Sequence, residues 1–117
     1  MTFEMKHLER IVHRMREASG YLELGMAQHA LDRLEGLGEL GPFEGEVNLL
    51  RGEAYEAQDR TDEAAASFAA AAKLLPPPFR RPAFLALSKV YEQVGDHDRA
   101  RAAMAHARGA GLPFPSK

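Results

Sequence analysis

The chain of 117 residues contains no cysteine. Disulfides, thiolate nucleophiles and zinc sites with cysteine ligands are therefore excluded. The chain also lacks long hydrophobic runs: its longest uncharged stretch, residues 64–72, is far shorter than the roughly 18 apolar residues that a membrane-spanning helix needs. The first ten residues mix charged and apolar side chains and contain no apolar core of a signal peptide. We therefore expect a soluble, cytoplasmic protein.

The net charge is only −2, but the charges are unevenly distributed. Residues 1–78 carry 8 Lys/Arg and 14 Asp/Glu, a net charge of −6, whereas residues 79–117 carry 7 and 3, a net charge of +4. Such a division could steer charged partners or favour head-to-tail contacts between copies. Scattered surface charge without consequence is the simpler alternative, because exposed ion pairs contribute little.

Side chains that carry catalysis or bind metals are not arranged in recognisable patterns. No i, i+4 histidine pair and no metal-ligand spacing occurs among the histidines: His7, His13, His29, His97 and His106. Asp96 and Asp98 flank His97, but they fit the capping and first turn of a helix. No nucleophile elbow or phosphate-binding glycine loop is present, and Arg80-Arg81 is too short a basic run for nucleic acid. We expect neither an enzyme nor a metal, cofactor, nucleic-acid or membrane partner.

Internal repetition is what the chain does contain. Tyr21, Tyr55 and Tyr91 are separated by 34 and then 36 positions. The same offsets relate four further sets of residues: Ala18, Gly52 and Ser88; Ala30, Ala64 and Ala100; Leu34, Phe68 and Met104; Leu37, Ala71 and Ala107. A period of this length indicates stacked supersecondary units, none of which can bury its apolar face alone.

Each copy is predicted to be two helices joined by a tight turn. In the second copy an apolar stripe over residues 49–55 is interrupted at residues 59–62, where Thr61 is the expected N-cap of the next helix. Prolines 76–78 should end that helix, because proline lacks a donor and clashes with the preceding turn. Gly25 and Gly95 should end the first helices of the other two copies. The opening helix is expected to begin near Thr2.

A small residue of each first helix is predicted to face a large residue of each second helix. Gly52 would lie opposite Phe68, and the pairs Ala18–Leu34 and Ser88–Met104 would be equivalent to it. The small member allows close approach of the two helices, and burial of the large member stabilises them. Truncation of Phe68 to alanine should cost about 3–5 kcal/mol.

This pattern resembles the tetratricopeptide repeat, whose 34-residue signature has a small residue, an aromatic, an alanine, a bulky residue, a second alanine and a closing proline. The residues of the second copy that match it are Gly52, Tyr55, Ala64, Phe68, Ala71 and Pro76. The resemblance implies a single all-α domain, a right-handed superhelix of three helix-turn-helix repeats. The predicted repeats are residues 11–44, 45–78 and 79–114, with residues 1–10 extending the first helix and residues 115–117 as a tail.

The outer face of the third copy carries charge where a fourth repeat would have to pack. Arg101 and Arg108 are seven residues apart and therefore share a helical stripe. Terminal repeats need such a polar face. We expect the third repeat to close the array; a piece of a longer solenoid is the alternative.

The resemblance also implies a concave groove lined by the first helix of each repeat. The residues that it would place there are Val12, Met15, Ser19, Leu22 and Glu23 from the first copy, Glu46, Leu49, Glu53 and Glu56 from the second, and Leu85, Lys89 and Glu92 from the third. An apolar strip with mostly acidic neighbours suits an amphipathic helix or extended segment with apolar anchors and basic flanks. Val12 and Leu49 could instead pack on neighbouring helices, and periodicity leaves both readings open.

These observations predict a non-enzymatic interaction module, an adaptor or chaperone-like protein that binds a peptide or helix of another protein. Structural self-association, head-to-tail or as a homodimer, is the alternative. Related repeat proteins hold the C-terminal carboxylates of chaperones with lysine, asparagine and arginine. The matching positions here cannot do so, since they are Met15, Ser19, Leu50, Pro82 and Ala86.

Overall fold

The computed structural model describes residues 4–109, which form helices and connecting turns and no strand. The helices are α1 (Met5–Glu23), α2 (Ala27–Arg33), α3 (Glu44–Ala57), α4 (Thr61–Leu74), α5 (Arg81–Gln93) and α6 (His97–Gly109), with short 3₁₀ turns η1 (Gly41–Phe43) and η2 (Pro77–Phe79). The all-α prediction is confirmed. Thr2 and residues 115–117 lie outside the described range, within which the first helix begins at Met5.

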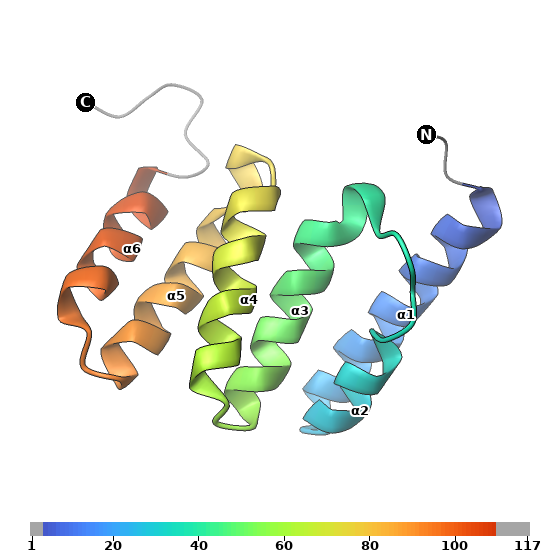
Figure 1. Ribbon diagram of the computed structural model, residues 1–117, viewed down its shortest axis with the longest axis horizontal. Coiled ribbons are helices and arrows are strands. Elements are labelled where there is room, and N and C mark those ends of the chain that lie inside the picture. Colours follow the sequence, from blue (N-terminus) through green and yellow to red (C-terminus); the bar gives the residue numbers. More distant parts are fainter. Residues whose placement is uncertain (1–3, 110–117) are drawn as a thin grey trace.

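The six α-helices lie side by side in chain order, as Figure 1 shows. Consecutive helices pack as the pairs α1–α2, α3–α4 and α5–α6, and α2–α3 and α4–α5 join the pairs into one stack. In the view of Figure 1, α2 lies in front of α1 and α4 lies in front of α5. Helices α1 and α5, the first helices of their pairs, therefore lie on the same side of the stack. The right-handed sense of the superhelix and the repeat boundaries stay predictions.

The three turns within the helix pairs share one backbone geometry. In each turn a main-chain N–H bonds to the carbonyl oxygen of the repeated tyrosine: Met26 to Tyr21 at 2.8 Å, Arg60 to Tyr55 at 2.9 Å and Asp96 to Tyr91 at 2.9 Å. The residue before each donor is left-handed, with φ of 73° at Gly25, 58° at Asp59 and 80° at Gly95. The roles expected for Gly25 and Gly95 are confirmed, and an aspartate takes the same conformation in the second turn.

The predicted N-cap at Thr61 is wrong. Thr61 is already the first residue of α4, and Arg60 occupies the cap position without a side-chain hydrogen bond to the helix. The turn after Tyr55 closes one residue earlier than the sequence reading assumed, because the Arg60 N–H bonds back to Tyr55. Asp96, by contrast, does cap α6, since its Oδ1 accepts the N–H of Arg99 at 3.1 Å.

The small-to-large contact between paired helices is confirmed in the second pair. A Cβ atom at Gly52 would lie only 2.6 Å from Cδ1 and Cε1 of Phe68, whose side chain is completely buried. Ala18 and Leu34, the equivalent residues of the first pair, are also completely buried. The absence of a side chain at Gly52 is therefore what lets α3 and α4 approach each other.

The buried side chains form two cores that meet at α3. The N-terminal core joins α1, α2 and α3 and consists of Ala18, Ala27, Ala30, Leu31, Leu34, Val47 and Ala54. The C-terminal core joins α4, α5 and α6 and consists of Ala64, Phe68, Ala71, Ala72, Leu75, Ala83, Leu87, Val90 and Ala103. Tyr55 packs against both cores. Helix α3 is thus held from both sides, and its orientation relative to α1 is fixed.

The connection between α4 and α5 contains the three consecutive prolines. Helix α4 ends at Leu74 and η2 follows at Pro77, as the prolines predicted. The Arg80 Nε donates a hydrogen bond to the Leu75 carbonyl oxygen at 2.6 Å, which satisfies an acceptor beyond the last turn of α4. Pro82 lies in the first turn of α5, where its missing N–H costs nothing.

Candidate functional site

The candidate site lies on the side of the stack formed by the first helices of the pairs, which we call the first-helix face (α1, α3 and α5). Helices α1 and α3 touch directly. Helix α5 is linked to α3 by an ion pair between Lys89 Nζ and Glu56 Oε2 at 3.5 Å. Helices α1 and α3 therefore share one surface, and an ion pair between side chains connects α5 to it.

A pocket of about 390 Å³ opens on this face between α1 and α3. Its lining contains five residues that the sequence reading placed in the groove: Val12, Met15, Ser19, Glu46 and Leu49. Val12, Met15 and Leu49 are half-buried. Part of each apolar side chain therefore remains in contact with solvent and would lose that contact under a ligand.

Three further residues line the same pocket and were not among the predicted groove residues: Arg16, Phe43 and Leu50, of which Leu50 was named only as a clamp position. Phe43 ends η1, and Leu50 follows Leu49 on α3. With them the lining has five large apolar side chains and two of opposite charge, Arg16 and Glu46. The pocket is thus less acidic than the sequence reading assumed. Met15, Ser19 and Leu50, three of the positions matching the carboxylate clamp, all line it.

The apolar residues predicted for the groove differ in whether they line the pocket, pack in a core or do both. Leu22 packs against the N-terminal core and does not line the pocket. Leu49 does both, since it packs against the C-terminal core and also lines the pocket. Val12 lines the pocket and belongs to neither core. Val12 is therefore the apolar pocket residue whose substitution disturbs the fold least.

Two glutamates continue the first-helix face beyond the pocket along α3. Burial raises the pKa of Glu53 above its ordinary value, and the negative charge of Glu56 raises it further. The Glu53 side chain is partly exposed to solvent, so its pKa is raised by the protein atoms that surround the rest of the side chain. Glu56 Oε2 is buried and accepts no hydrogen bond, and its only ionic partner within the described chain is Lys89. A cation supplied at this place would compensate both carboxylates.

The predicted groove residues of α5 lie away from the α1–α3 pocket. Leu85 and Lys89 are exposed, and neither lines that pocket. Glu92 pairs with His97 across the turn between α5 and α6, at 2.6 Å between Oε1 and Nδ1. Glu23 is exposed at the C-terminal end of α1. The structure therefore gathers the predicted residues of α1 and α3 and leaves the others around them.

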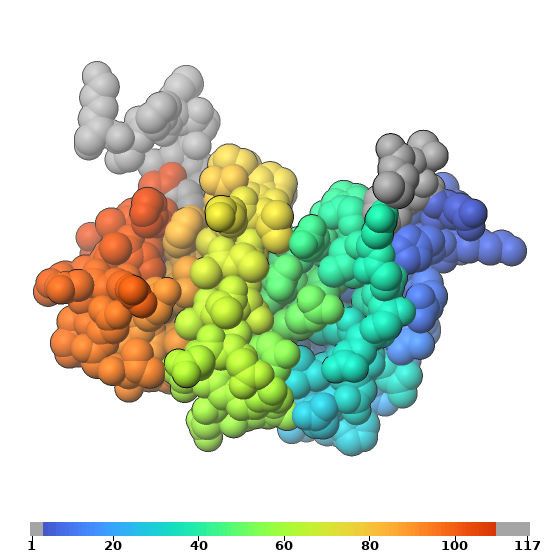
Figure 2. All heavy atoms as spheres, viewed as in Figure 1, coloured from blue at the N-terminus to red at the C-terminus, as the bar shows by residue number. Residues whose placement is uncertain are grey.

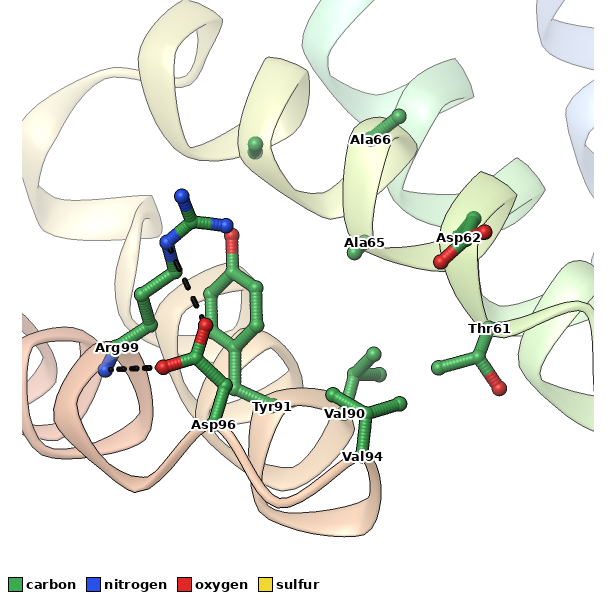
Figure 3. Close-up of a pocket in the computed structure, with 10 residues that line it drawn as sticks. Thr61, Asp62, Ala65, Ala66, Val90, Tyr91, Val94, Asp96 and Arg99 are labelled. Carbon is green, nitrogen blue, oxygen red and sulfur yellow. Dashed lines mark hydrogen bonds and ion pairs between the residues drawn. The ribbon is translucent and has the colours of Figure 1, made fainter.

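A second hollow, of about 310 Å³, lies between the N-terminal half of α4 and the turn joining α5 to α6 (Figure 3). Two residues of its lining pair with each other: Asp96 accepts the Arg99 N–H and pairs with the Arg99 guanidinium at 3.5 Å. That guanidinium lies 5.9 Å from the centre of the Tyr91 ring. Arg33 over Tyr21 and Arg60 over Tyr55 repeat the contact in the other two pairs. The three arginines lie 12, 5 and 8 positions after their tyrosines, so they occupy different positions of the repeat, and we interpret the contacts as local packing.

Comparison with known proteins identifies the second helix pair. Residues 45–76, which cover α3, α4 and the turn between them, match the tetratricopeptide repeat family. Comparison of the chain with curated proteins and with solved structures gave no match. Arrays of such repeats present extended surfaces for binding other proteins. No helix within residues 4–109 is long and apolar enough to cross a membrane.

Proposed function

We propose that this chain, in which residues 45–76 form a tetratricopeptide repeat, is a non-enzymatic interaction module that binds a segment of another protein on its first-helix face. The observation that carries the proposal is the pocket between α1 and α3 with its five large apolar side chains. A pocket of this size accommodates one or two apolar side chains of an amphipathic helix or extended peptide. Such anchors typically supply most of the binding energy of an interface.

The charges around the pocket define the flanks of the partner. Glu46 lies on the pocket wall, and Glu53 and Glu56 follow it along α3. Basic residues on one side of the apolar anchor would meet these carboxylates, while Arg16 on α1 favours an acidic or neutral residue on the other side. A cation beside Glu53 would also lower its raised pKa again. Binding should therefore weaken as the pH falls into the range in which Glu53 gains a proton.

The test uses peptides selected from a displayed random library on the immobilised protein. Val12→Glu places a charge in the pocket, and we expect it to weaken the selected peptides at least about tenfold. Val94→Glu is the matched control, because Val94 is 55% exposed and lies at the end of α5 outside the pocket. Equal affinity for both folded variants would show that the pocket is not the binding site.

Reversal of charge tests the flanks of the peptide separately. Glu53→Lys should weaken peptides with basic flanks, whereas Glu35→Lys, an equal change of charge at an exposed residue between α2 and α3, should leave them unaffected. The same weakening by both variants would mean that only net charge matters. In that case the proposal that basic flanks of the peptide meet the carboxylates of α3 is wrong.

Self-association is the second candidate function, and the uneven charge distribution is the observation that favours it. Residues 1–78 carry a net charge of −6 and residues 79–117 a net charge of +4. Head-to-tail contact would join these parts and would be weakened by salt. Light scattering over a range of salt concentrations separates the two candidates. A monomer at every concentration excludes self-association, and oligomers that dissociate in salt support it.

A further inference from the structure

A larger hollow, of about 750 Å³, lies between α4, α5 and α6, and the function proposed above does not use it. We call it the α4–α6 hollow. Its lining residues are Ala69, Ala70, Ala72, Lys73, Arg80, Phe84, Leu87 and His106. Figure 2 shows the side of the molecule to which α4 (yellow-green) and α6 (orange-red) both contribute surface.

The hollow lies on a different side of α5 from the predicted groove residues. Phe84 and Leu87 line it, whereas Leu85 and Lys89 belong to the first-helix face. Neighbouring positions on a helix are about 100° apart, so residues 84 and 87 cannot share a stripe with residues 85 and 89. A ligand in this hollow would therefore leave the α1–α3 pocket free.

Alanines and one aromatic pair give the hollow its shape. The wall on α4 is made of alanines, whose short side chains leave the space open. Phe84 stacks on the imidazole of His106 with ring centres 5.0 Å apart and an interplanar angle of 22°. Leu87 lies beside Phe84 at the base, and its side chain belongs to the C-terminal core. The base is thus apolar and firmly held, which suits an apolar anchor.

Every ionisable side chain of this hollow is basic: Lys73 on α4, Arg80 before α5 and His106 on α6. Residues 64–91 and 99–109, which supply the whole lining, contain no Asp or Glu. Lys73 is exposed in the last turn of α4. Arg80 is held in place by the hydrogen bond from its Nε to the Leu75 carbonyl oxygen, which uses one of its five N–H donors. The rim therefore attracts carboxylates and offers none of its own.

We infer that the α4–α6 hollow binds an acidic segment of a partner protein that carries an aromatic or aliphatic anchor. The anchor lies on Phe84 and Leu87, and the carboxylates that flank it meet Lys73 and Arg80. A free phosphate or a nucleic-acid backbone would match the charges but leave the apolar base uncovered. The partner is opposite in charge to the basic segment proposed for the first-helix face, so one chain can hold both at once.

The probe is a fluorescein-labelled peptide of about twelve residues with a central Leu-Phe pair flanked by glutamates. Two companion peptides carry lysines in place of the glutamates or serines in place of the Leu-Phe pair. Fluorescence anisotropy measures binding to the full chain at low and moderate salt. We expect the acidic peptide with its anchor to bind at least about tenfold more tightly than either companion, and more weakly as salt increases.

Two variants test the place of binding, and two controls match them. Lys73→Glu reverses a charge on the rim, and Ala69→Glu fills the exposed edge of α4 without interrupting the helix; each should weaken the peptide at least about tenfold. Arg108→Glu makes the same change of charge as Lys73→Glu on α6 but outside the hollow, and should leave affinity within about twofold of wild type. Val12→Glu in the α1–α3 pocket should likewise have no effect.

Four results would overturn the inference. With the wild-type protein, these are equal affinity for the acidic and lysine peptides, or full affinity for the peptide without the Leu-Phe anchor. With the variants, they are equal losses of affinity in Lys73→Glu and Arg108→Glu, or loss of binding in Val12→Glu. Self-association that Lys73→Glu abolishes would also overturn it, because the occupant would then be a second copy. The proposed function fails if Val12→Glu keeps its affinity for the library peptides, and that result says nothing about the acidic peptide. The two proposals can therefore fail separately.

Discussion

At the scale of single residues, the contact between Gly52 and Phe68 restricts substitution most severely. An added methyl group at residue 52 would lie 2.6 Å from two carbons of the completely buried Phe68 ring. Gly52→Ala should therefore lower the free energy of unfolding by about 1–3 kcal/mol, the usual cost of overpacking, although alanine favours the helix. Urea denaturation of variant and wild type measures the difference.

Gly20 provides the control for this substitution. It lies in α1, and an added Cβ would meet no atom within 4 Å. Gly20→Ala should raise the free energy of unfolding by roughly 0.5–1 kcal/mol, because alanine loses less backbone entropy. The opposite signs at Gly52 and Gly20 separate tight packing from helix propensity. A gain in both variants would contradict the close approach of α3 and α4.

The residue scale also shows where sequence reasoning succeeds. The contact of Gly52 with Phe68 could be predicted, because three copies of the repeat put a small residue and a large one in the same register. Arg16 and Phe43 of the pocket were not predicted. Arg16 lies four positions after Val12 and three before Ser19, so it shares their helical face and periodicity could have placed it in the pocket. The position of Phe43 depends on the irregular connection before α3, for which the sequence has no periodic signal.

At the scale of helices, the N-termini of α4 and α6 differ in how they are capped. Asp96 accepts the Arg99 N–H, whereas Thr61 lies inside α4 and caps nothing. Asp96→Ala should lower the free energy of unfolding by about 0.5–2 kcal/mol, and Thr61→Ala should change it by less than about 0.5 kcal/mol. Thermal unfolding measures both changes. Equal losses in the two variants would mean that Thr61 does cap α4 in solution.

The error at Thr61 has an instructive physical origin. N-cap preference alone favoured a threonine followed by two acidic residues, and those acidic residues do lie in the first turn of α4. The repeat register contains a better signal. Asp96 corresponds to Arg60, 36 positions earlier, so the third copy already indicates that the cap falls at residue 60. Helices and their pairing could be predicted, and comparison of the copies would also have placed this boundary; the hydrogen bond from the Arg60 N–H to the Tyr55 carbonyl oxygen shows it directly.

At the scale of the whole molecule, α3 joins the two cores, since its Tyr55 packs against both. Val47 on α3 is completely buried in the N-terminal core, and Val90 on α5 is 1% exposed in the C-terminal core. The second helix of the first pair is the shortest, since α2 has 7 residues whereas α4 has 14 and α6 has 13. In stacked repeats, stability is approximately a sum over units and nearest-neighbour contacts. We therefore expect the first pair to open before the others.

Hydrogen exchange of the Val47→Ala variant tests this order of opening. Loss of the buried side chain should cost roughly 1.5–3 kcal/mol, located at the contact between the first and second pairs. Amides of α1 and α2 should then exchange faster than in wild type, while those of α5 and α6 change little. Because the α1–α3 pocket needs both helices in place, the variant should also lose the peptides selected on the first-helix face.

Val90→Ala makes the same chemical change in the C-terminal core and should give the opposite pattern. Exchange should then accelerate in α5 and α6, with α1 and α2 protected as in wild type, and peptides of the first-helix face should still bind. Uniform acceleration along the chain in both variants would mean that the molecule opens as one cooperative unit. The binding surfaces would then be lost together, and two partners held on separate faces would stabilise each other through the fold.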